Sequence, residues 1–548
     1  MLTERWAEIL QIERVGIHDN FFALGGDSLL ATRVLAHIRD TMYLEIGASR
    51  IFEAPTVAEM AHHLEALMLA GQARRPSADI VPVPRKDGMP ASIAQERLWQ
   101  LQQVLPGMPF FNALYALRLT SQVDVPVLER SFNEILQRHE ILRTTFAVVD
   151  HRYVQIIAPR LTAPLRFNDL HPLPKSKKES IGHQIVREEA LHSFDLAQGP
   201  LLRARLVRLA EREHLLLITM HQIIGDGWSL GVLVDELAAL YDAFSSDASS
   251  PLPPVRIQYA DFACWQREWR SHPEIGAQLT YWQEQLRDPL PVMKFATPVR
   301  PTRIIDHFRT ARRQWALPAS LSEAAKRFSH REGGTLFMAL VAALMTLLHR
   351  RLRQDDLRIA TLVANRHRPG TELLIGPLVN TAILRTNLGG DPTPREVMRR
   401  VRGTVLAAFA HQDLPFEDLI EVLERERSLK PVTLANVLVL LQNATLRPTA
   451  SSGHILTFEE ADPSMLLPLV TITTFDVILM LHESGQGLMG TCVYKPHLFS
   501  AMTINCLLRD FQEVLEQMVA QPERPISAIR VSRNRQRPNR KVRSESVS

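Results

Sequence analysis

A buried strand that breaks sharply into an amphipathic helix is the feature that most constrains this fold. The apolar run Leu215–Ile218 is typical of a buried strand. The stretch that follows, Thr219–Ser229 (TMHQIIGDGWS), contains an Asp-Gly pair that signals a tight turn. The predicted helix after the turn has an apolar face made of Leu230, Leu233, Leu237 and Leu240. Such a junction holds the polar side chains of the turn in fixed places, so we expect a functional site here.

Composition and charge limit the classes of protein to which this chain can belong. The chain has 548 residues and is 46% hydrophobic, which is enough for two or three domains with real cores. Residues 533–548 hold six basic side chains and one acidic, so this segment carries +5 and the rest of the chain −1 of the total +4. The basic balance is therefore a property of the tail and gives no support for nucleic-acid binding.

Cysteine usage and hydropathy point to the cytoplasm. Cys264, Cys492 and Cys506 have neither metal-ligand spacing nor the spacing of a disulfide framework, which fits a reducing compartment and predicts no metal site. No signal peptide is visible, and the longest apolar run, Leu336–Leu348, is too short to span a bilayer. We therefore expect a cytoplasmic protein without a membrane segment.

The first 70 residues have the pattern of a small all-α helical bundle. Helices are predicted over Leu2–Ile12, from Ser28 onward, and behind the capping box Thr56–Glu59. Ser28 stands at a helix start, where a hydroxyl caps well, and taken alone it would be only an N-cap. Ten acidic residues against five arginines make this unit acidic.

The remaining chain is expected to form a linker, two α+β lobes and a tail. Residues 71–88 are rich in proline and polar residues, which predicts a linker. Runs of helices and paired strands then occur twice, over 89–268 and 269–532, and residues 533–548 form a polar, basic tail expected to be disordered. The first lobe is predicted to hold the strand pairs Thr144–Val149 with Tyr153–Ile157 and Leu202–Leu209 with His214–His221. The second is predicted to hold helices at Leu321–Phe328, Thr335–Arg350, Pro394–His411 and Pro415–Arg425 and strands at Leu357–Val363, Asn436–Leu441 and Thr471–Leu481.

Six motifs resemble, in order and spacing, the core motifs of condensation domains in non-ribosomal peptide synthetases. The turn at 219–229 resembles their HHxxxDG motif. The others are SIAQERLW at 92–99, RHEILRTTF at 138–146, YADFACWQ at 259–266, IGPLVNT at 375–381 and HQDLPFE at 411–417. The resemblance implies a V-shaped pair of chloramphenicol-acetyltransferase-like lobes, with a tunnel between them that admits carrier domains from both ends.

The N-terminal unit resembles a peptidyl carrier domain. The stretch DNFFALGGDSLL at 19–30, with FEAPT at 52–56, is similar to the family's LGGxSL region. The resemblance implies that Ser28 carries a 4′-phosphopantetheine arm, attached by a phosphopantetheinyl transferase. A phosphate ester is favoured at a helix N-terminus. We thus expect a role in secondary-metabolite biosynthesis, in which the carrier holds a thioester and the condensation domain joins a carrier-bound donor and acceptor by an amide bond.

One position departs from the family pattern. The resemblance places the catalytic site at His221, Gln222, Asp226 and Gly227, but the family has its catalytic histidine where this chain has Gln222. A neutral amide does not titrate near pH 7, although it can hold a nucleophile by a hydrogen bond. Neighbouring side chains of an extended segment point to opposite faces, so His221 is expected to be structural. Asp226 is expected to order the loop, with Arg366 or Arg385 as its partner.

Three interpretations are open at this stage. The chain is an active acyl or peptidyl transferase, a condensation fold with lost or reduced catalysis that docks carriers or a partner enzyme, or a free acyltransferase of the same superfamily. The attached carrier argues against the third. The sequence shows no adenylation domain, so aminoacyl or peptidyl thioesters are expected to come from other synthetase modules with adenylation and carrier domains.

Overall fold

The computed structural model describes most of the chain. Ser28, the first half of the predicted linker, residues 471–474 and the basic tail lie outside the described residues, and so do the predictions made for them. The described residues are 2–10, 12–26, 30–31, 34–35, 37–38, 42, 46, 50–69, 79–104, 106–109, 111–287, 290, 293, 309–427, 434–442, 455–456, 458–460, 475–484 and 487–531.

The N-terminal unit is helical, as predicted. Its core is aromatic: Trp6 is fully buried and meets Phe21 edge to face, with ring centroids 5.0 Å apart. The capping box forms, because the Glu59 N–H donates to Thr56 Oγ1 at 3.2 Å and the Thr56 N–H donates to Glu59 Oε2 at 3.1 Å. The numbered helices are α1 (Leu2–Leu10), α3 (Arg50–Glu53) and α4 (Val57–Leu69).

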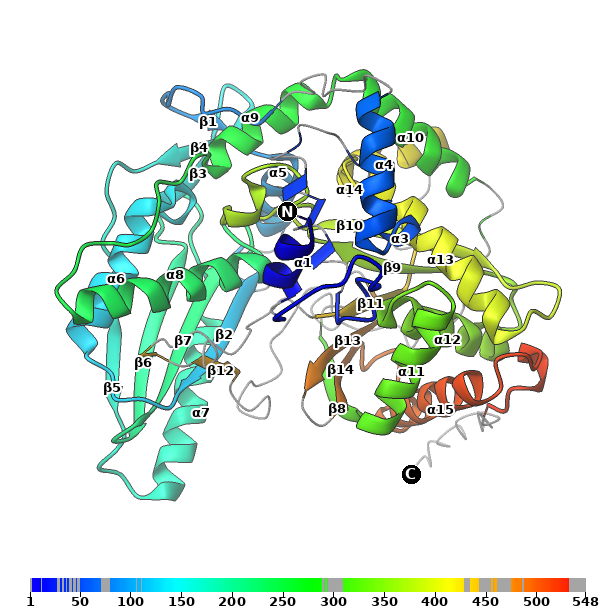
Figure 1. Cartoon of the computed structure of the whole chain (residues 1–548). Helices are drawn as coiled ribbons and strands as arrows, with labels where there is room; N and C mark the ends of the chain where they lie inside the picture. Colours follow the sequence, from blue (N-terminus) through cyan, green and yellow to red (C-terminus); the bar gives the residue numbers. More distant parts are fainter. Residues whose placement is uncertain are drawn as a thin grey trace, which may run out of the picture.

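The first lobe is built on a sheet with the strand order β12-β2-β7-β6-β5 (Figure 1). Alternate residues of β7 face opposite sides of this sheet: Leu216 and Ile218 pack in the main core, and Leu215 and Leu217 pack under α7. A smaller sheet has the order β1-β4-β3. The elements are β1 (Met89–Pro90), α5 (Ile93–Val104), β2 (Asn112–Leu119), α6 (Val125–Arg138), β3 (Thr144–Val149), β4 (Arg152–Ile157), β5 (Arg166–Asp169), α7 (Lys175–Leu191), β6 (Leu202–Ala210), β7 (Glu213–His221), α8 (Gly227–Ser245) and α9 (Tyr259–Trp269). The next helix, α10 (Pro273–Gln285), packs on the second lobe, where the Trp282 Nε1 donates to the His411 carbonyl at 2.9 Å.

The second lobe lies beside the first and repeats its layered design (Figure 1). Its sheet has the order β10-β9-β11-β13-β14-β8, and the nearly all-buried helix α12 forms its core. The elements are β8 (Ala311–Pro318), α11 (Ala319–Arg331), α12 (Leu336–Leu352), β9 (Asp356–Val363), β10 (Asn380–Asn387), α13 (Pro394–Ala410), α14 (Phe416–Arg427), β11 (Val437–Leu441), β13 (Val477–Ser484), β14 (Gly487–Tyr494) and α15 (Ala501–Ala520).

The predicted fold class, a helical bundle followed by two α+β lobes, is confirmed. Both predicted strand pairs form, β3 with β4 and β6 with β7, each antiparallel. Strand β12 (Phe458–Glu460) was not predicted: it comes from the C-terminal half, pairs with β2 and completes the sheet of the first lobe (Figure 1). The lobes therefore share a sheet as well as an interface.

The second half of the predicted linker is anchored on the first lobe. The Val83 N–H donates to Asp261 Oδ1 at 2.8 Å, and the Arg85 guanidinium contacts the same carboxylate at 2.6 Å. Arg85 also donates to Glu140 at 2.7 Å. Because Asp261 is only 1% exposed, the two bonds to its carboxylate are partly shielded from water.

Among the residues that the structure describes, no single helix is long and apolar enough to cross a membrane, and α11 with α12 has the length and composition only as a pair bent by 100°.

Candidate active site

The turn between β7 and α8 is built as the sequence predicts. Strand β7 ends at His221, and Asp226 is the N-cap of α8. Asp226 Oδ1 accepts from the Ser229 N–H at 2.9 Å, and Ser229 Oγ accepts from the Asp226 N–H at 3.2 Å. This reciprocal capping box fixes the turn through local contacts alone.

Asp226 also joins the two lobes through Arg366. The guanidinium binds the carboxylate in a bidentate pair, with both N···O distances 2.9 Å. The backbone N–H groups of Leu378 and Val379 donate to Asp226 Oδ2 at 3.1 and 3.2 Å. Burial alone would raise the pKa of Asp226, but the charge of Arg366 and the hydrogen bonds from Arg366 and Ser229 outweigh it and hold the pKa below its ordinary value. The carboxylate is thus ionised and fully engaged, which suits a structural role.

The fold decides between the two candidate arginines. Arg385 pairs with Asp356 at 2.6 Å on the neighbouring strands β10 and β9. Arg366 has a side chain with 0% exposure and follows the end of β9, opposite the α8 N-terminus. Of the two, Arg366 is therefore the one that reaches the turn.

Gly376 completes the contact between the lobes. Its N–H donates to Ser229 Oγ at 3.0 Å, and its carbonyl accepts from Arg366 at 3.2 Å. The Tyr259 ring lies so close that a Cβ at position 376 would fall 1.9 Å from a ring carbon. Only glycine allows this approach, so the IGPLVNT motif serves to hold the turn of the other lobe.

His221 lies in the core, as expected. It is 2% exposed and stands edge to face against Phe111 and Phe194, at centroid distances of 5.8 and 6.2 Å. Its Nδ1 accepts from the Ile223 N–H at 3.1 Å. Burial lowers the pKa of His221 to about 3, so the ring is neutral at physiological pH.

The side chain of Gln222 has different surroundings from that of His221. It is half-buried, and its backbone N–H donates to the Phe111 carbonyl at 2.8 Å. Its side-chain amide makes no hydrogen bond to any residue that the structure describes. The amide is therefore available to a ligand, whereas the adjacent imidazole is not.

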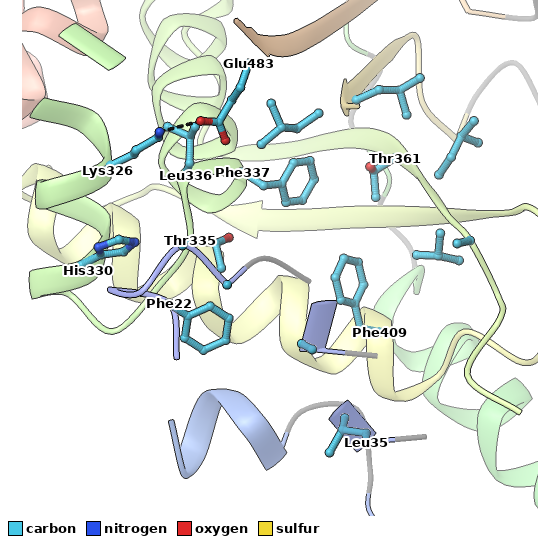
Figure 2. A pocket seen from close by; sticks show the side chains of 18 of the residues that line it. Phe22, Leu35, Lys326, His330, Thr335, Leu336, Phe337, Thr361, Phe409 and Glu483 are labelled. Carbon is cyan, nitrogen blue, oxygen red and sulfur yellow. Dashed lines mark ion pairs between the residues drawn. The ribbon is translucent and has the colours of Figure 1, made fainter. Parts of the chain in front are cut away.

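A cavity of about 710 Å³ opens beside this site, between the N-terminal unit and the second lobe. The loop 22–26 lines one side, and Trp228 and Arg366 line another. Figure 2 shows Phe22 and Leu35 across from His330, Thr335 and Phe409. Trp228 is half-buried: it packs against the hydrophobic core, lines the cavity wall, and its Nε1 donates to the Glu372 carbonyl at 2.8 Å. Gly227 opens α8 next to it.

Sequence reasoning missed two residues of this region. His367 lines the cavity and contacts Asp413 at 2.8 Å. His367 follows Arg366 directly, and Asp413 lies in the HQDLPFE motif, but nothing local shows that the two segments meet. Only their long-range packing brings them together.

Comparison with known proteins agrees with this architecture. The Condensation domain family matches residues 85–538, and the Phosphopantetheine attachment site family matches residues 2–64. The chain is 42% identical over 524 residues to a linear gramicidin synthase from Brevibacillus parabrevis and 36% identical over 539 residues to malpinin synthetase from Mortierella alpina. These matches cover 96% and 97% of this chain but only 10% and 7% of those relatives, so the chain spans a small part of their length.

Solved structures show the same fold. The X-domain from teicoplanin biosynthesis is 26% identical, with a TM-score of 0.69 over 83% of this chain and 100% of that one. The first condensation domain of the calcium-dependent antibiotic synthetase, at 19% identity, has a TM-score of 0.68 over 82% of this chain and 100% of that one. The chain therefore belongs to the condensation-domain family of non-ribosomal peptide synthetases, with a domain for 4′-phosphopantetheine attachment ahead of the condensation domain.

Proposed function

We propose that this copy forms an amide bond between a donor held as a thioester on its own Ser28 arm and an amine held on an acceptor carrier. The amine nitrogen attacks the thioester carbonyl, the C–N bond forms, and the C–S bond breaks. The donor thiol leaves, and the amine loses one proton. The observation that carries the proposal is the fully bonded turn at Asp226 beside a Gln222 amide that has no partner among the described residues.

The roles of the site residues follow from their surroundings. Gln222 holds the attacking amine by a hydrogen bond and does not take its proton, so orientation is its contribution. Asp226 fixes the turn, and Gly227 begins α8 without a side chain to block the approach. His221 supports the turn as a neutral, packed ring.

The surroundings of the carrier loop suit a 4′-phosphopantetheine group. The cavity begins at residues 22–26, just before Ser28, and extends to Trp228 beside the turn. When bound, the group supplies the reactive thioester. The residues that would hold it are those of this cavity, whose wall combines aromatic side chains with many polar and charged ones.

The proposed partners follow from the relatives, which are multi-module synthetases. A phosphopantetheinyl transferase loads Ser28, and other synthetase modules with adenylation and carrier domains supply the aminoacyl or peptidyl thioesters. The domain limits in this proposal are 1–70 for the carrier, 89–268 for the first lobe and 269–532 for the second.

The test is product formation by the wild type, Gln222→Ala and Gln222→His with a loaded donor and a loaded acceptor carrier. The wild type should exceed Gln222→Ala about fivefold, the effect of one hydrogen bond worth ~1 kcal/mol. Gln222→His should be faster, because a general base adds ~100-fold or more. If all three match the uncatalysed rate while carriers still bind, the chain is a docking module and the proposal fails.

A further inference from the structure

A carboxylate at the seam between the lobes is not used by the proposed reaction. Glu417 ends the HQDLPFE motif and lies in the first turn of α14, which packs against α5 of the first lobe. Its side chain is half-buried, and within the described ranges the one hydrogen-bond donor that it meets is its own backbone N–H. The adjacent Asp418, by contrast, pairs with Arg270 of the first lobe at 2.9 Å. Glu417 is therefore a carboxylate without a cation in direct contact among the described residues.

The Glu417 carboxylate is open to a ligand. Asp418 Oδ2 is a fully buried oxygen without a partner, whereas neither oxygen of Glu417 is such an atom. Because no other residue in the described part of the chain bonds these oxygens, at least one of them must have accessible surface. A half-buried carboxylate that keeps an accessible oxygen is placed to bind a cation that enters the seam.

One short segment connects Glu417 to the turn between β7 and α8. The Val379 N–H donates to Asp226 Oδ2 at 3.2 Å, which holds the turn. The next residue, Asn380, accepts the Phe416 N–H on its Oδ1 at 3.0 Å, which holds the start of α14. Two consecutive residues therefore bind the turn and the helix that carries Glu417, so the first turn of α14 lies next to the site.

Tyr259 lies between the two carboxylates. Its Oη donates to the Pro377 carbonyl at 3.0 Å and is 2.9 Å from Ser92 Oγ. Burial raises the pKa of Tyr259, and the negative charges of Asp226 and Glu417 raise it further. Both carboxylates therefore act on the same phenol, which places Glu417 within electrostatic range of the site.

Helix α5 closes the same seam from the first lobe. Gln95 Nε2 donates to the carbonyl of Ile223, the residue after Gln222, at 3.2 Å. Arg97, two residues further along α5, is exposed, and its positive charge acts on Glu417. One helix thus lies against the residue next to Gln222 and against the surroundings of Glu417.

The surroundings of Glu417 favour a proton on its carboxyl. Burial raises the pKa of Glu417, and the charge of the neighbouring Asp418 raises it further. The backbone N–H of Glu417 and the charge of Arg97 lower the pKa but are outweighed. Tyr259 stays neutral beside it, because its own pKa is raised. A carboxyl with a raised pKa takes a proton from an amine more readily than an ordinary carboxylate does.

The acceptor amine must lose a proton before it can attack. An α-amino group has an ordinary pKa of about 7.7–8.0, so at pH 7 most of it is ammonium, which has no lone pair. Gln222 cannot take that proton, and His221 is packed in the core with a pKa of about 3. An ammonium and a carboxylate form a charge-assisted hydrogen bond, which suits both the capture of the amine and the transfer of its proton.

We propose that Glu417 binds the ammonium group of the acceptor as it enters between the lobes and takes one proton from it. An N–H bond of the ammonium breaks and an O–H bond forms on the carboxyl, so the neutral amine passes to Gln222 for attack. When the C–N bond forms, the second amine proton goes to the departing thiolate, and the Glu417 carboxyl then releases its proton to water. This inference rests on the proposed function, because it names the proton acceptor for the same amine.

The reaction test compares two loads on the acceptor carrier. One is glycine, whose amine is largely ammonium at pH 7, and the other is an aminooxyacetyl group, whose amine is neutral at that pH. With glycine, Glu417→Gln should lower the rate of product formation about tenfold, the effect of one hydrogen bond between charged groups. With the aminooxyacetyl group, the wild type and Glu417→Gln should agree to within about twofold. An equal loss with both loads would show a merely structural role and overturn the inference.

Glu421→Gln is the matched control, because it makes the same change one turn further along α14. The Glu421 side chain is 55% exposed and pairs with Arg270 and Arg425 at 3.2 and 2.7 Å. Its replacement should leave both rates unchanged. A loss with glycine as large as that of Glu417→Gln would show that any charge on α14 has this effect, and the inference would fail.

A binding measurement tests the same contact without chemistry. The probe is glycyl-aminopantetheine, in which a stable amide replaces the thioester, and its N-acetylated form has no ammonium group. Isothermal titration calorimetry of the full chain should show that the wild type binds the first probe about tenfold more tightly than the second, and that Glu417→Gln binds both about equally. Equal affinities of the wild type for the two probes would contradict the inference.

The outcomes also separate this inference from the proposed function. If the wild type discriminates between the two probes through Glu417 but forms no product with either load, amide-bond formation fails and the ammonium site stands. If product forms and Glu417→Gln matches the wild type with glycine, the ammonium site fails and the proposed function stands.

Discussion

Replacing Asp226 with alanine should weaken the junction between the lobes. The substitution leaves the Arg366 guanidinium, with 0% side-chain exposure, without its carboxylate, and it also removes the acceptor for the Leu378 and Val379 N–H groups. Leaving one partner of a buried pair uncompensated costs about 4 kcal/mol. The two lobes together have roughly 440 residues, and unfolding releases an entropy of ~2.1 cal/mol/K per residue. Dividing the lost free energy by this total entropy gives a fall in Tm of roughly 4 °C.

Thermal unfolding of the full chain measures this fall, with Asp356→Ala as the control. Asp356 pairs with Arg385, but both are about one-fifth exposed, so water can solvate the arginine that remains and the shift should be smaller. The folded pKa of Asp226 lies below its unfolded value of about 3.9, so its contribution is present above pH 4 and lost as pH falls through the folded pKa. The difference in Tm between the wild type and Asp226→Ala should therefore be constant from pH 5 to 7 and should become smaller below pH 4. An unchanged Tm at pH 7 would refute the reasoning.

Three further outcomes are expected. Intact mass should show one phosphopantetheine group on the wild type after loading and none on Ser28→Ala; a group that persists in the variant would place the attachment elsewhere. Limited proteolysis should cut at 70–78 and spare 79–88. Arg85→Ala should open the second range, because the side-chain contacts of Arg85 with Asp261 and Glu140 are lost. Equal cleavage of both ranges in the wild type would contradict this. The pKa of His221 is about 3 in the folded chain and about 6.5 in the unfolded chain, so Tm should decline as pH falls below 6.5. In His221→Phe this decline in Tm should be less steep. If Tm falls with pH equally in the wild type and His221→Phe, the His221 ring is not the cause.

Features that depend on neighbouring residues could be predicted from the sequence. The strand, turn and helix from 213 to 245 follow from local hydrophobic periodicity, and the opposed directions of His221 and Gln222 follow from the geometry of an extended segment. The partner of Asp226 was narrowed to two arginines but not chosen, because only the packing of the lobes puts Arg366 across from α8. The pair formed by His367 and Asp413 was missed for the same reason.

Strand β12 makes the two lobes unsuitable as interchangeable parts. Residues 458–460 belong by sequence to the C-terminal half, but they are hydrogen-bonded to β2 and place Phe458 against the core beside Leu117 and Leu119. A recombinant chain that exchanges the lobes at their sequence boundary would give the first lobe a foreign strand or leave β2 as an open, aggregation-prone edge. Engineering of new synthetases from this domain should therefore transfer residues 458–460 together with the N-terminal lobe, so the crossover points lie at two places in the gene.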